Sequence, residues 1–389
     1  MTICILGRQP EIGLAELEAL YGTGKVKQIS NDVALVDAVV DFSRIGGSIK
    51  VAELLATVSS AKPSIAFSKI KSLLPQLIGS MPVGKVKLGL SLYNIDMSPY
   101  TINGEALRLK KAIKNHGRSV RVVPNETPAL SSAQTYHNSL SSTLGLEFVI
   151  VRSDDKAYIG CVSHVQDIDA YRIRDRERPK RDAFVGMLPP KLAQTIVNLA
   201  LGQKEFNAET YVLDPFCGTG VVLQEAWLMG YAVYGSDISP KMVNYTQTNL
   251  EWLAEKAKTT DGTRIRLETA DAKDHIWRQP LDIVACEGYL GQPLGGQNPS
   301  EEKLREIIHD CNSTMRAFLK NIRPQLPDHA RLCVAMPAWF VGGKYHHLPV
   351  IDELKTLDFK PISFTHAPEG LLYRRDDQVT GRELVVLET

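Results

Sequence analysis

One stretch of the sequence combines a carboxylate, an aromatic ring and two glycines within seven residues. Asp214-Pro-Phe-Cys-Gly218-Thr-Gly220 follows the apolar run Tyr-Val-Leu and precedes a helix-forming segment. Glycines at a strand-to-helix junction let a ligand approach the backbone, and the amide end of the helix favours negative groups on that ligand. A dinucleotide-binding loop would have a third glycine where this chain has Leu223, and the Gly-Lys-Ser/Thr of a P-loop is absent. The ligand is therefore expected to belong to another class.

Two further acids follow at the ends of the next two expected strands. Asp237 ends Tyr-Gly-Ser-Asp, and Asp271 lies in Thr-Ala-Asp-Ala. In a wound parallel sheet, neighbouring strand ends meet at one crevice, so we expect Asp214, Asp237 and Asp271 to face a single ligand. Carboxylates in this arrangement suit an ammonium group, a ribose diol and an exocyclic amine. Asp237 or Asp271 alone would be interpreted as a helix cap, and it is their register with the glycine loop that favours a binding site.

The elements that must position these residues alternate from residue 188 onward. We expect helix 191–201, strand 211–214, a helix, strand 232–237, a helix, strands 264–271 and 281–287, a helix, strand 330–336 and closing strands 362–367 and 383–388. Strands alternating with helices predict a parallel sheet wound on both faces. The two closing strands have no helix between them, which predicts an antiparallel hairpin at the edge of the sheet.

The first part of the chain is predicted to form a separate α/β region. Strands at 2–7 and 33–39 flank helix Leu14–Tyr21; helices near 50–58 and 63–78, strand 85–93, a basic helix and strands 119–123, 147–153 and 156–163 follow.

Charge is unevenly distributed along the chain, whose net charge is only +1. Residues 1–49 carry −2, residues 50–183 carry +8, and residues 184–389 carry −5. A local positive surplus is typical of a polyanion-binding module, because phosphate contacts need local charge. We predict nucleic-acid contact by Arg108, Lys110, Lys111, Lys114, Arg118 and Arg121, among which no acid lies. A second basic run, 172–181, is interrupted by acids and is interpreted as a linker, with RNA contact left open.

Length and composition exclude several classes of protein. With 389 residues, 44% hydrophobic and 23% charged, the chain is expected to fold into two or three globular domains. No apolar run approaches the roughly 18 residues of a membrane-spanning helix. The six cysteines lie far apart without a Cys-x-x-Cys pair. We expect a soluble, cytoplasmic protein with no disulfide and no metal.

Together these motifs resemble those of the class I S-adenosylmethionine-dependent methyltransferases, specifically the tRNA guanosine N2-methyltransferases that carry an N-terminal THUMP RNA-binding domain. DPFCGTG is similar to the first motif of the family, SDIS to its ribose motif and ADA to its adenine motif, while LKKAIKNHGRSVRVVPN and LSSAQTYHN resemble its THUMP domain. The resemblance implies an α/β protein with a ferredoxin-like portion at 1–49, a THUMP domain at 50–166, a linker at 167–187 and a Rossmann-like methyltransferase domain at 188–389. The last would have a mostly parallel, seven-stranded sheet.

The resemblance also implies a cofactor and the residues that hold it. S-adenosylmethionine would be bound by Asp214, Phe216, Gly218, Thr219, Gly220, Asp237, Ile238, Asp271 and Ala272. The methionine end would lie at the glycine loop, the ribose at Asp237 and the adenine at Asp271.

The fourth motif departs from the family. Its members end the fourth strand with Asp-Pro-Pro-Tyr, whereas this strand continues into Glu287-Gly-Tyr289-Leu-Gly. In the family, the acid of this motif accepts a hydrogen bond from the target amine and the aromatic ring stacks on the base. When Asp282 is aligned with the strand acid of the family, Glu287 takes the position of the acceptor and Tyr289 that of the stacking ring. An acceptor and a flat ring are what an amine needs to be oriented toward a methyl sulfonium, so these two residues are the predicted catalytic pair.

The expected activity is methylation of an exocyclic amine in tRNA, with the 2-amino group of a guanosine as the target that the family implies and the THUMP region gripping the tRNA. Two alternatives stay open: a protein that binds RNA and cofactor without transferring a methyl group, and a DNA amino-methyltransferase. Cys286 could act as a nucleophile in carbon-5 methylation, although a buried cysteine at a strand end is the preferred interpretation.

Overall fold

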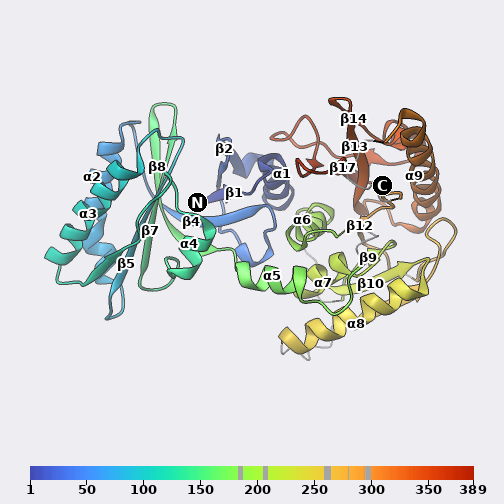
Figure 1. The fold of residues 1–389 in the computed structure, drawn as a ribbon, viewed down its shortest axis with the longest axis horizontal. Helices are drawn as coiled ribbons and strands as arrows, with labels where there is room; N and C mark the ends of the chain where they lie inside the picture. Colours follow the sequence, from blue (N-terminus) through green and yellow to red (C-terminus); the bar gives the residue numbers. More distant parts are fainter. Residues whose placement is uncertain (183–186, 205–208, 258–263, 279, 293, 295–298) are drawn as a thin grey trace. The chain divides into compact units, whose positions relative to one another are not determined.

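The computed structural model describes residues 1–182, 187–204, 209–257, 264–278, 280–292, 294 and 299–389 (Figure 1). Within them the chain divides into two compact units. Unit 1 comprises Met1–Leu14, Thr23–Ser43 and Gly47–Ala170, and unit 2 comprises Ala15–Gly22, Arg44–Gly46 and Tyr171–Thr389. The predicted linker 167–187 is thus divided between the units at residue 170, and its residues 183–186 lie outside the described part of the chain.

Unit 1 is built on one mixed sheet in the order β2-β3-β1-β4-β8-β7-β5-β6. The strands are β1 (Thr2–Leu6), β2 (Val26–Ser30), β3 (Val33–Val36), β4 (Ser48–Val58), β5 (Val86–Tyr93), β6 (Val120–Val122), β7 (Gly145–Ser153) and β8 (Lys156–Val165). β5 is parallel to β6 and β7, and the other pairs are antiparallel. Residues 1–49 and 50–166 therefore contribute to one sheet, and the predicted boundary between them falls inside β4.

Two helices, α2 (Pro63–Gly79) and α3 (Pro99–Asn115), lie side by side on this sheet, α2 against β4 and β8 and α3 against β5 and β6 (Figure 1). Ser98 caps α3, because its hydroxyl accepts the N–H of Thr101 at 3.3 Å. Ile102, Ala106, Leu109 and Ile113 are buried at helical spacing. This confirms the predicted basic helix and leaves its other face in solvent. Unit 1 also contains α4 (Ser132–His137), and α1 (Pro10–Tyr21) is divided between the units.

The helix predicted near residues 50–58 is wrong, because this segment forms β4. Its Ala, Glu and Leu residues favour a helix locally. The strand instead pairs with β1 on one side and β8 on the other, and it buries Val51 and Ala52. Pairing on both edges outweighs a propensity of a few tenths of a kcal/mol per residue.

A buried ion pair lies at the centre of unit 1. Lys50 Nζ on β4 lies 2.6 Å from Glu147 Oε1 on β7, and both side chains are inaccessible to solvent. The hydroxyl of Ser91 donates to Oε1 and that of Thr135 to Oε2, each at 2.6 Å. Burial lowers the pKa of Lys50, which the charge of Glu147 opposes. Both carboxylate oxygens thus have protein donors, as a buried charge requires.

Unit 2 is built on a second sheet with the main path β11-β10-β9-β12-β13-β17-β15. The strands are β9 (Tyr211–Asp214), β10 (Ala232–Asp237), β11 (Ile265–Thr269), β12 (Ile283–Glu287), β13 (Arg331–Val341), β14 (Lys344–His346), β15 (Lys360–Pro361), β16 (Leu372–Tyr373) and β17 (Thr380–Glu388). From β11 to β13 the pairs are parallel, while β17 is antiparallel to β13 and β15. The predicted Rossmann-like fold is confirmed, but the sheet is mixed: its parallel part runs from β11 to β13, β17 and β15 complete the main path, and the short strands β14 and β16 also pair antiparallel.

Helices cover both faces of this sheet (Figure 1). α6 (Pro190–Leu201) packs on β12 and β13, α7 (Val221–Leu228) on β9 and β10, and α8 (Pro240–Ala257) on β10 and β11. α9 (Glu301–Ile322) packs on the other face, where Met315 and Phe318 share a core with Leu213 and Val284. The carboxyl ends of the parallel strands are left at one edge between these layers. The 3₁₀ turns are η1 (Thr23–Lys25), η2 (Phe42–Arg44), η3 (Arg323–Gln325) and η4 (Pro349–Leu357).

The predicted strand 362–367 is wrong, since only Lys360–Pro361 pair with β17 as β15. Pro361 has no N–H to donate to a ladder, and regular pairing ends there, with one further bond from Ile362 N–H to Val386 O at 2.8 Å. The predicted last strand is confirmed and begins earlier, at Thr380.

Part of the second basic run, residues 172–181, is buried in the packing of unit 2. It forms α5 (Ile168–Arg176), whose Arg174 binds both oxygens of the buried Glu225 on α7, at 2.7 and 3.3 Å. Arg178 is only 3% exposed. These two arginines are therefore part of the packing of unit 2 and are not exposed for contact with RNA.

No helix in the described part of the chain is long and apolar enough to cross a membrane. The described residues bring together no group of three metal-binding side chains, and no disulfide joins the cysteines among them.

Candidate active site

The glycine loop connects β9 to α7 and is fixed by α8. Gly218 and Gly220 have φ angles of 52° and 81°, which favour glycine. A Cβ at Gly220 would lie 2.8 Å from Thr246 Cγ2 on α8, so only glycine permits this approach. The Thr246 hydroxyl donates to Gly218 O at 2.9 Å. The loop is thereby held in one shape at the edge of the sheet.

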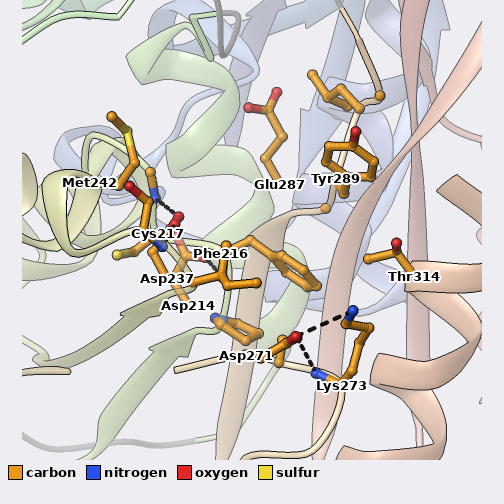
Figure 2. A pocket seen from close by; sticks show the side chains of 18 of the residues that line it. Asp214, Phe216, Cys217, Asp237, Met242, Asp271, Lys273, Glu287, Tyr289 and Thr314 are labelled. Atoms are coloured by element: carbon orange, nitrogen blue, oxygen red, sulfur yellow. Dashed lines mark hydrogen bonds and ion pairs between the residues drawn. The ribbon is translucent and has the colours of Figure 1, made fainter. Parts of the chain in front are cut away.

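A cavity of about 850 Å³ opens beside this loop (Figure 2). Asp214 ends β9, Asp237 ends β10 and Asp271 follows β11, and all three line the cavity. The strands are parallel neighbours, so their ends meet at one edge as expected. Eight of the nine predicted cofactor-binding residues line the cavity: Asp214, Phe216, Gly218, Thr219, Asp237, Ile238, Asp271 and Ala272. Gly220, the N-cap of α7, is not among the lining residues.

Asp214 is a buried carboxylate with no ion-pair partner among the described residues. It is 2% exposed, and its Oδ1 accepts the N–H of Phe216 at 3.1 Å. Burial raises its pKa well above the usual range; Asp237 and Glu287 add to that shift, and the Phe216 amide opposes it. Such a group fits a ligand that brings a positive charge.

The other two acids are partly engaged by the backbone. Asp237 accepts the N–H of Gly218 at 3.0 Å and that of Ser239 at 2.8 Å, so it also organises the two loops around it. Asp271 accepts the N–H of Lys273 at 3.0 Å, and Lys273 Nζ lies 3.3 Å from its second oxygen. Each carboxylate retains lone pairs for a further donor.

Glu287 and Tyr289 lie at one end of the cavity in Figure 2, and Asp271 and Lys273 lie at the other. Phe216 stands in the cavity wall, edge-on to Phe318 with 5.0 Å between ring centroids. Tyr289 is 40% exposed, so its ring is accessible to a planar partner. The structure therefore brings both predicted catalytic residues to the same cavity as the three acids.

The fourth-strand loop is built differently from Asp-Pro-Pro-Tyr for a geometric reason. Gly288 N–H donates to Ala335 O at 2.9 Å, a bond that proline lacks the hydrogen to form. A Cβ at Gly288 would lie 2.8 Å from Met315 Sδ. The glycine therefore lets α9 approach and extends the β12–β13 pairing by one bond.

Glu287 is held by a residue that the sequence did not reveal. Arg382 Nε on β17 donates to Glu287 Oε1 at 2.5 Å, and the two side chains are 7% and 15% exposed. Burial raises the pKa of Glu287, and Arg382 opposes that shift by its charge and its hydrogen bond. The two residues lie 95 positions apart, so no local pattern could have connected them.

Cys286 points away from this chemistry. It is inaccessible to solvent, it does not line the cavity, and burial raises the pKa of its thiol well above the usual range. A thiolate nucleophile is therefore disfavoured.

α9 contributes polar residues that sequence reasoning missed. His309, Asp310, Ser313 and Thr314 line the cavity. Asp310, Ser313 and Thr314 follow an i, i+3, i+4 spacing, in a stripe beside the buried Cys311 and Met315. This polar stripe is the pattern from which the sequence could have predicted that α9 lines the site.

The six predicted RNA-binding residues lie on and around α3 and β6 of unit 1, and they fall into two groups. Arg118 donates to Pro82 O at 2.5 Å and to Met81 O at 3.3 Å, and Arg108 pairs with Glu105 at 2.5 Å. Lys110, Lys111, Lys114 and Arg121 form no ion pair among the described residues, and all except the half-buried Lys110 are exposed.

Comparisons with known proteins identify the class of the domain and the family. Residues 178–323 match the RMKL-like methyltransferase domain. A tRNA (guanine(10)-N2)-dimethyltransferase of Pyrococcus abyssi is 44% identical over 204 residues, 52% of this chain and 50% of the relative. A probable tRNA (guanine(10)-N2)-dimethyltransferase of Methanothermococcus thermolithotrophicus is 48% identical over 128 residues, 32% of this chain and 74% of the relative. The crystal structure of TrmN from Thermus thermophilus shares the fold, with a TM-score of 0.50 and 17% identity over 100% of this chain and 99% of that one.

The fold and the site define a methyltransferase domain of the RMKL-like class. The chain belongs to the tRNA (guanine(10)-N2)-dimethyltransferase family, because its match covers 74% of one relative at 48% identity. This confirms the resemblance to the tRNA guanosine N2-methyltransferases. The matches span about half the length of the other curated relatives, between 43% and 50%.

The cofactor of this class of domain is S-adenosylmethionine, and the cavity fits it. The buried Asp214 has no cation of its own among the described residues, and this cofactor carries both an ammonium and a sulfonium group. Two further strand-end carboxylates offer acceptors to its hydroxyl and amino groups.

Proposed function

We propose that this protein transfers methyl groups from S-adenosylmethionine to the 2-amino group of guanosine 10 in tRNA. One observation carries the proposal: Glu287 and Tyr289 line the same cavity as Asp214, Asp237 and Asp271. The names of the relatives supply the nucleic acid, the base and its position.

Three acids would hold the cofactor, each for a different reason. Asp214, buried beside the glycine loop, would bind the ammonium group. Asp237 would accept from the ribose hydroxyls, and Asp271 from the adenine amine, with Phe216 and Ile238 as apolar walls. When bound, the cofactor supplies an electrophilic methyl group.

Glu287 and Tyr289 would hold the target base. The ring of Tyr289 offers a stacking surface to a flipped guanine, and Glu287 Oε2 accepts a hydrogen bond from its amine. Burial raises the pKa of Glu287, so the carboxylate is a better proton acceptor than an exposed one. Oε2 can therefore take the proton that the amine loses after methyl transfer.

The THUMP-like unit 1 would grip the tRNA through its exposed basic side chains. Lys111, Lys114 and Arg121 form no ion pair among the described residues, and Lys69 and Lys71 add exposed charges on the neighbouring α2. Phosphate contacts by these residues would fix the tRNA and so select which guanosine reaches unit 2. We propose the cytoplasm as the place where the enzyme meets its tRNA substrate.

Transfer of labelled methyl groups tests the proposal. The full chain is incubated with labelled S-adenosylmethionine and bulk tRNA, with duplex DNA as a parallel substrate, and the nucleosides are identified by mass spectrometry. We expect label in N2-methylated guanosine from tRNA only. Label in DNA would favour the DNA amino-methyltransferase, and cofactor binding without any transfer would favour a non-catalytic binding protein.

A further inference from the structure

Arg382, near the start of β17, is the side chain that holds Glu287. Its Nε donates to Oε1 at 2.5 Å, and the residue is only 6% exposed. Among the described residues that line the cavity, Glu287 is present and Arg382 is not. Any influence of Arg382 on a bound base therefore passes through the Glu287 carboxylate.

The register of the sheet explains why this arginine reaches the fourth strand. Glu287 is in register with Ala335 on β13, and Ala335 with Leu384 on β17. Arg382 precedes Leu384 by two residues, so its side chain leaves the same face of the sheet, nearer the carboxyl edge. The small side chain of Ala335, on the strand between, leaves room for the contact. Because β17 is antiparallel, its beginning lies where β12 ends.

The contact occupies only half of the carboxylate. Oε1 accepts from Arg382, whereas Oε2 has no hydrogen-bond partner among the described residues. This differs from the buried Lys50–Glu147 pair, in which each carboxylate oxygen has a donor. The free oxygen belongs to a side chain that faces the cavity, so a donor there would meet Oε2.

The surroundings of Glu287 otherwise oppose its ionisation. Its side chain is 15% exposed and burial raises its pKa, while its own charge raises the pKa of Asp214 on β9 and of the Cys286 thiol on β12. Tyr289 follows on the same loop. Arg382 is the cation that acts on Glu287 within the described part of the chain.

We propose that Arg382 is a positioning residue that keeps Glu287 ionised and turns Oε2 toward the exocyclic amine of the target base. The identity of that amine rests on the proposed function. The charge state of the carboxylate does not, and it can be measured on the protein alone.

Infrared difference spectroscopy of the full chain makes that measurement. Spectra of each protein minus its Glu287→Gln counterpart isolate the protonated-carboxyl band of Glu287 as pH is varied. In Arg382→Met we expect the midpoint of this band to move up by about one to three pH units, the usual effect of a close opposite charge. In Arg382→Lys the midpoint of the band should lie between that of Arg382→Met and that of the unmodified protein.

Glu383→Gln is the matched control. It removes a charge one residue along β17, on the opposite face, and should leave the midpoint of Glu287 unchanged. An Arg382→Met midpoint equal to that of the unmodified protein overturns the inference. If the methionine variant does not fold, Arg382→Gln, which also removes the charge, decides in the same way.

Methyl transfer supplies a second readout. Arg382→Met should lower kcat roughly 10- to 100-fold while the affinity for S-adenosylmethionine stays constant, and Arg382→Lys should recover part of it. The acid limb of the kcat profile should move with the infrared midpoint, whereas a merely structural role would lower kcat without moving it. If the unmodified protein methylates no tRNA, the proposed function fails and the infrared shift still decides the role of Arg382.

Discussion

Each unit carries a carboxylate–cation pair within its sheet, and the two pairs differ in what they leave unbonded. In unit 1, Glu147 has donors on both oxygens, from Lys50, Ser91 and Thr135, and no part of the pair is accessible. In unit 2, Glu287 has a described donor on one oxygen only, and it lies at a cavity.

The difference separates a structural pair from a functional one. The Lys50–Glu147 pair can only stabilise or specify the fold, because both side chains are inaccessible to solvent and no ligand can reach them. A half-saturated carboxylate at a cavity has both a fixed position and a free acceptor. Substitutions in the two pairs should therefore affect different properties. Those in the Lys50–Glu147 pair should lower stability, and those in the Arg382–Glu287 pair should lower catalysis.

Substituting the unsaturated carboxylate should have the largest effect. Glu287→Gln retains the shape of the side chain but removes the charged acceptor, so methyl transfer to tRNA should fall about 10²- to 10⁴-fold. Affinity for S-adenosylmethionine, measured by calorimetry, should change little. A variant that transfers methyl groups at the normal rate would show that Glu287 is not the acceptor.

Breaking the saturated pair should instead cost stability. Lys50→Met leaves Glu147 buried without its cation, and we expect a loss of about 3–5 kcal/mol in the free energy of unfolding, measured with urea. Combining it with Glu147→Leu should restore much of the loss, because the uncompensated charge is gone. Equal instability of the single and double variants would argue against this account of the pair.

Asp214→Asn should weaken cofactor binding by about 1.5–3 kcal/mol, the value of a hydrogen bond to a charged group. The folded-state pKa of Asp214 is raised, so its contribution to stability is present at low pH and is lost as pH rises through that pKa. Conversely, affinity of the unmodified protein for S-adenosylmethionine should fall as pH drops through the same range. Calorimetry across pH should show that dependence, and the asparagine variant should lack it.

Reversing charge on the basic surface should have the smallest effect per residue. Lys111→Glu, Lys114→Glu and Arg121→Glu should each weaken tRNA binding in a salt-sensitive way, changing the slope of log affinity against log salt by roughly 0.7–0.9 per lost contact. Arg108→Ala serves as the control, because Glu105 already neutralises that charge. Normal tRNA binding by the reversed variants at raised salt would mean that this face of α3 is only solvated.

The sequence revealed the parts of the site that lie near one another along the chain. The glycine loop, Asp237 and Asp271 each end or follow a strand, and the alternation of strands and helices places those ends at one edge. Arg382 could not be found this way, since its contact with Glu287 depends on the order and register of β12, β13 and β17. β4 was missed for a related reason: partners on both edges override its local preference for helix.

The most direct test of the account replaces the target amine itself. A tRNA carrying inosine at position 10 keeps the ring and the backbone of guanosine but lacks the 2-amino group. With labelled S-adenosylmethionine, the protein should label the guanosine-10 tRNA and leave the inosine-10 tRNA unlabelled. Equal labelling of both, or of neither, would contradict methylation of that amine.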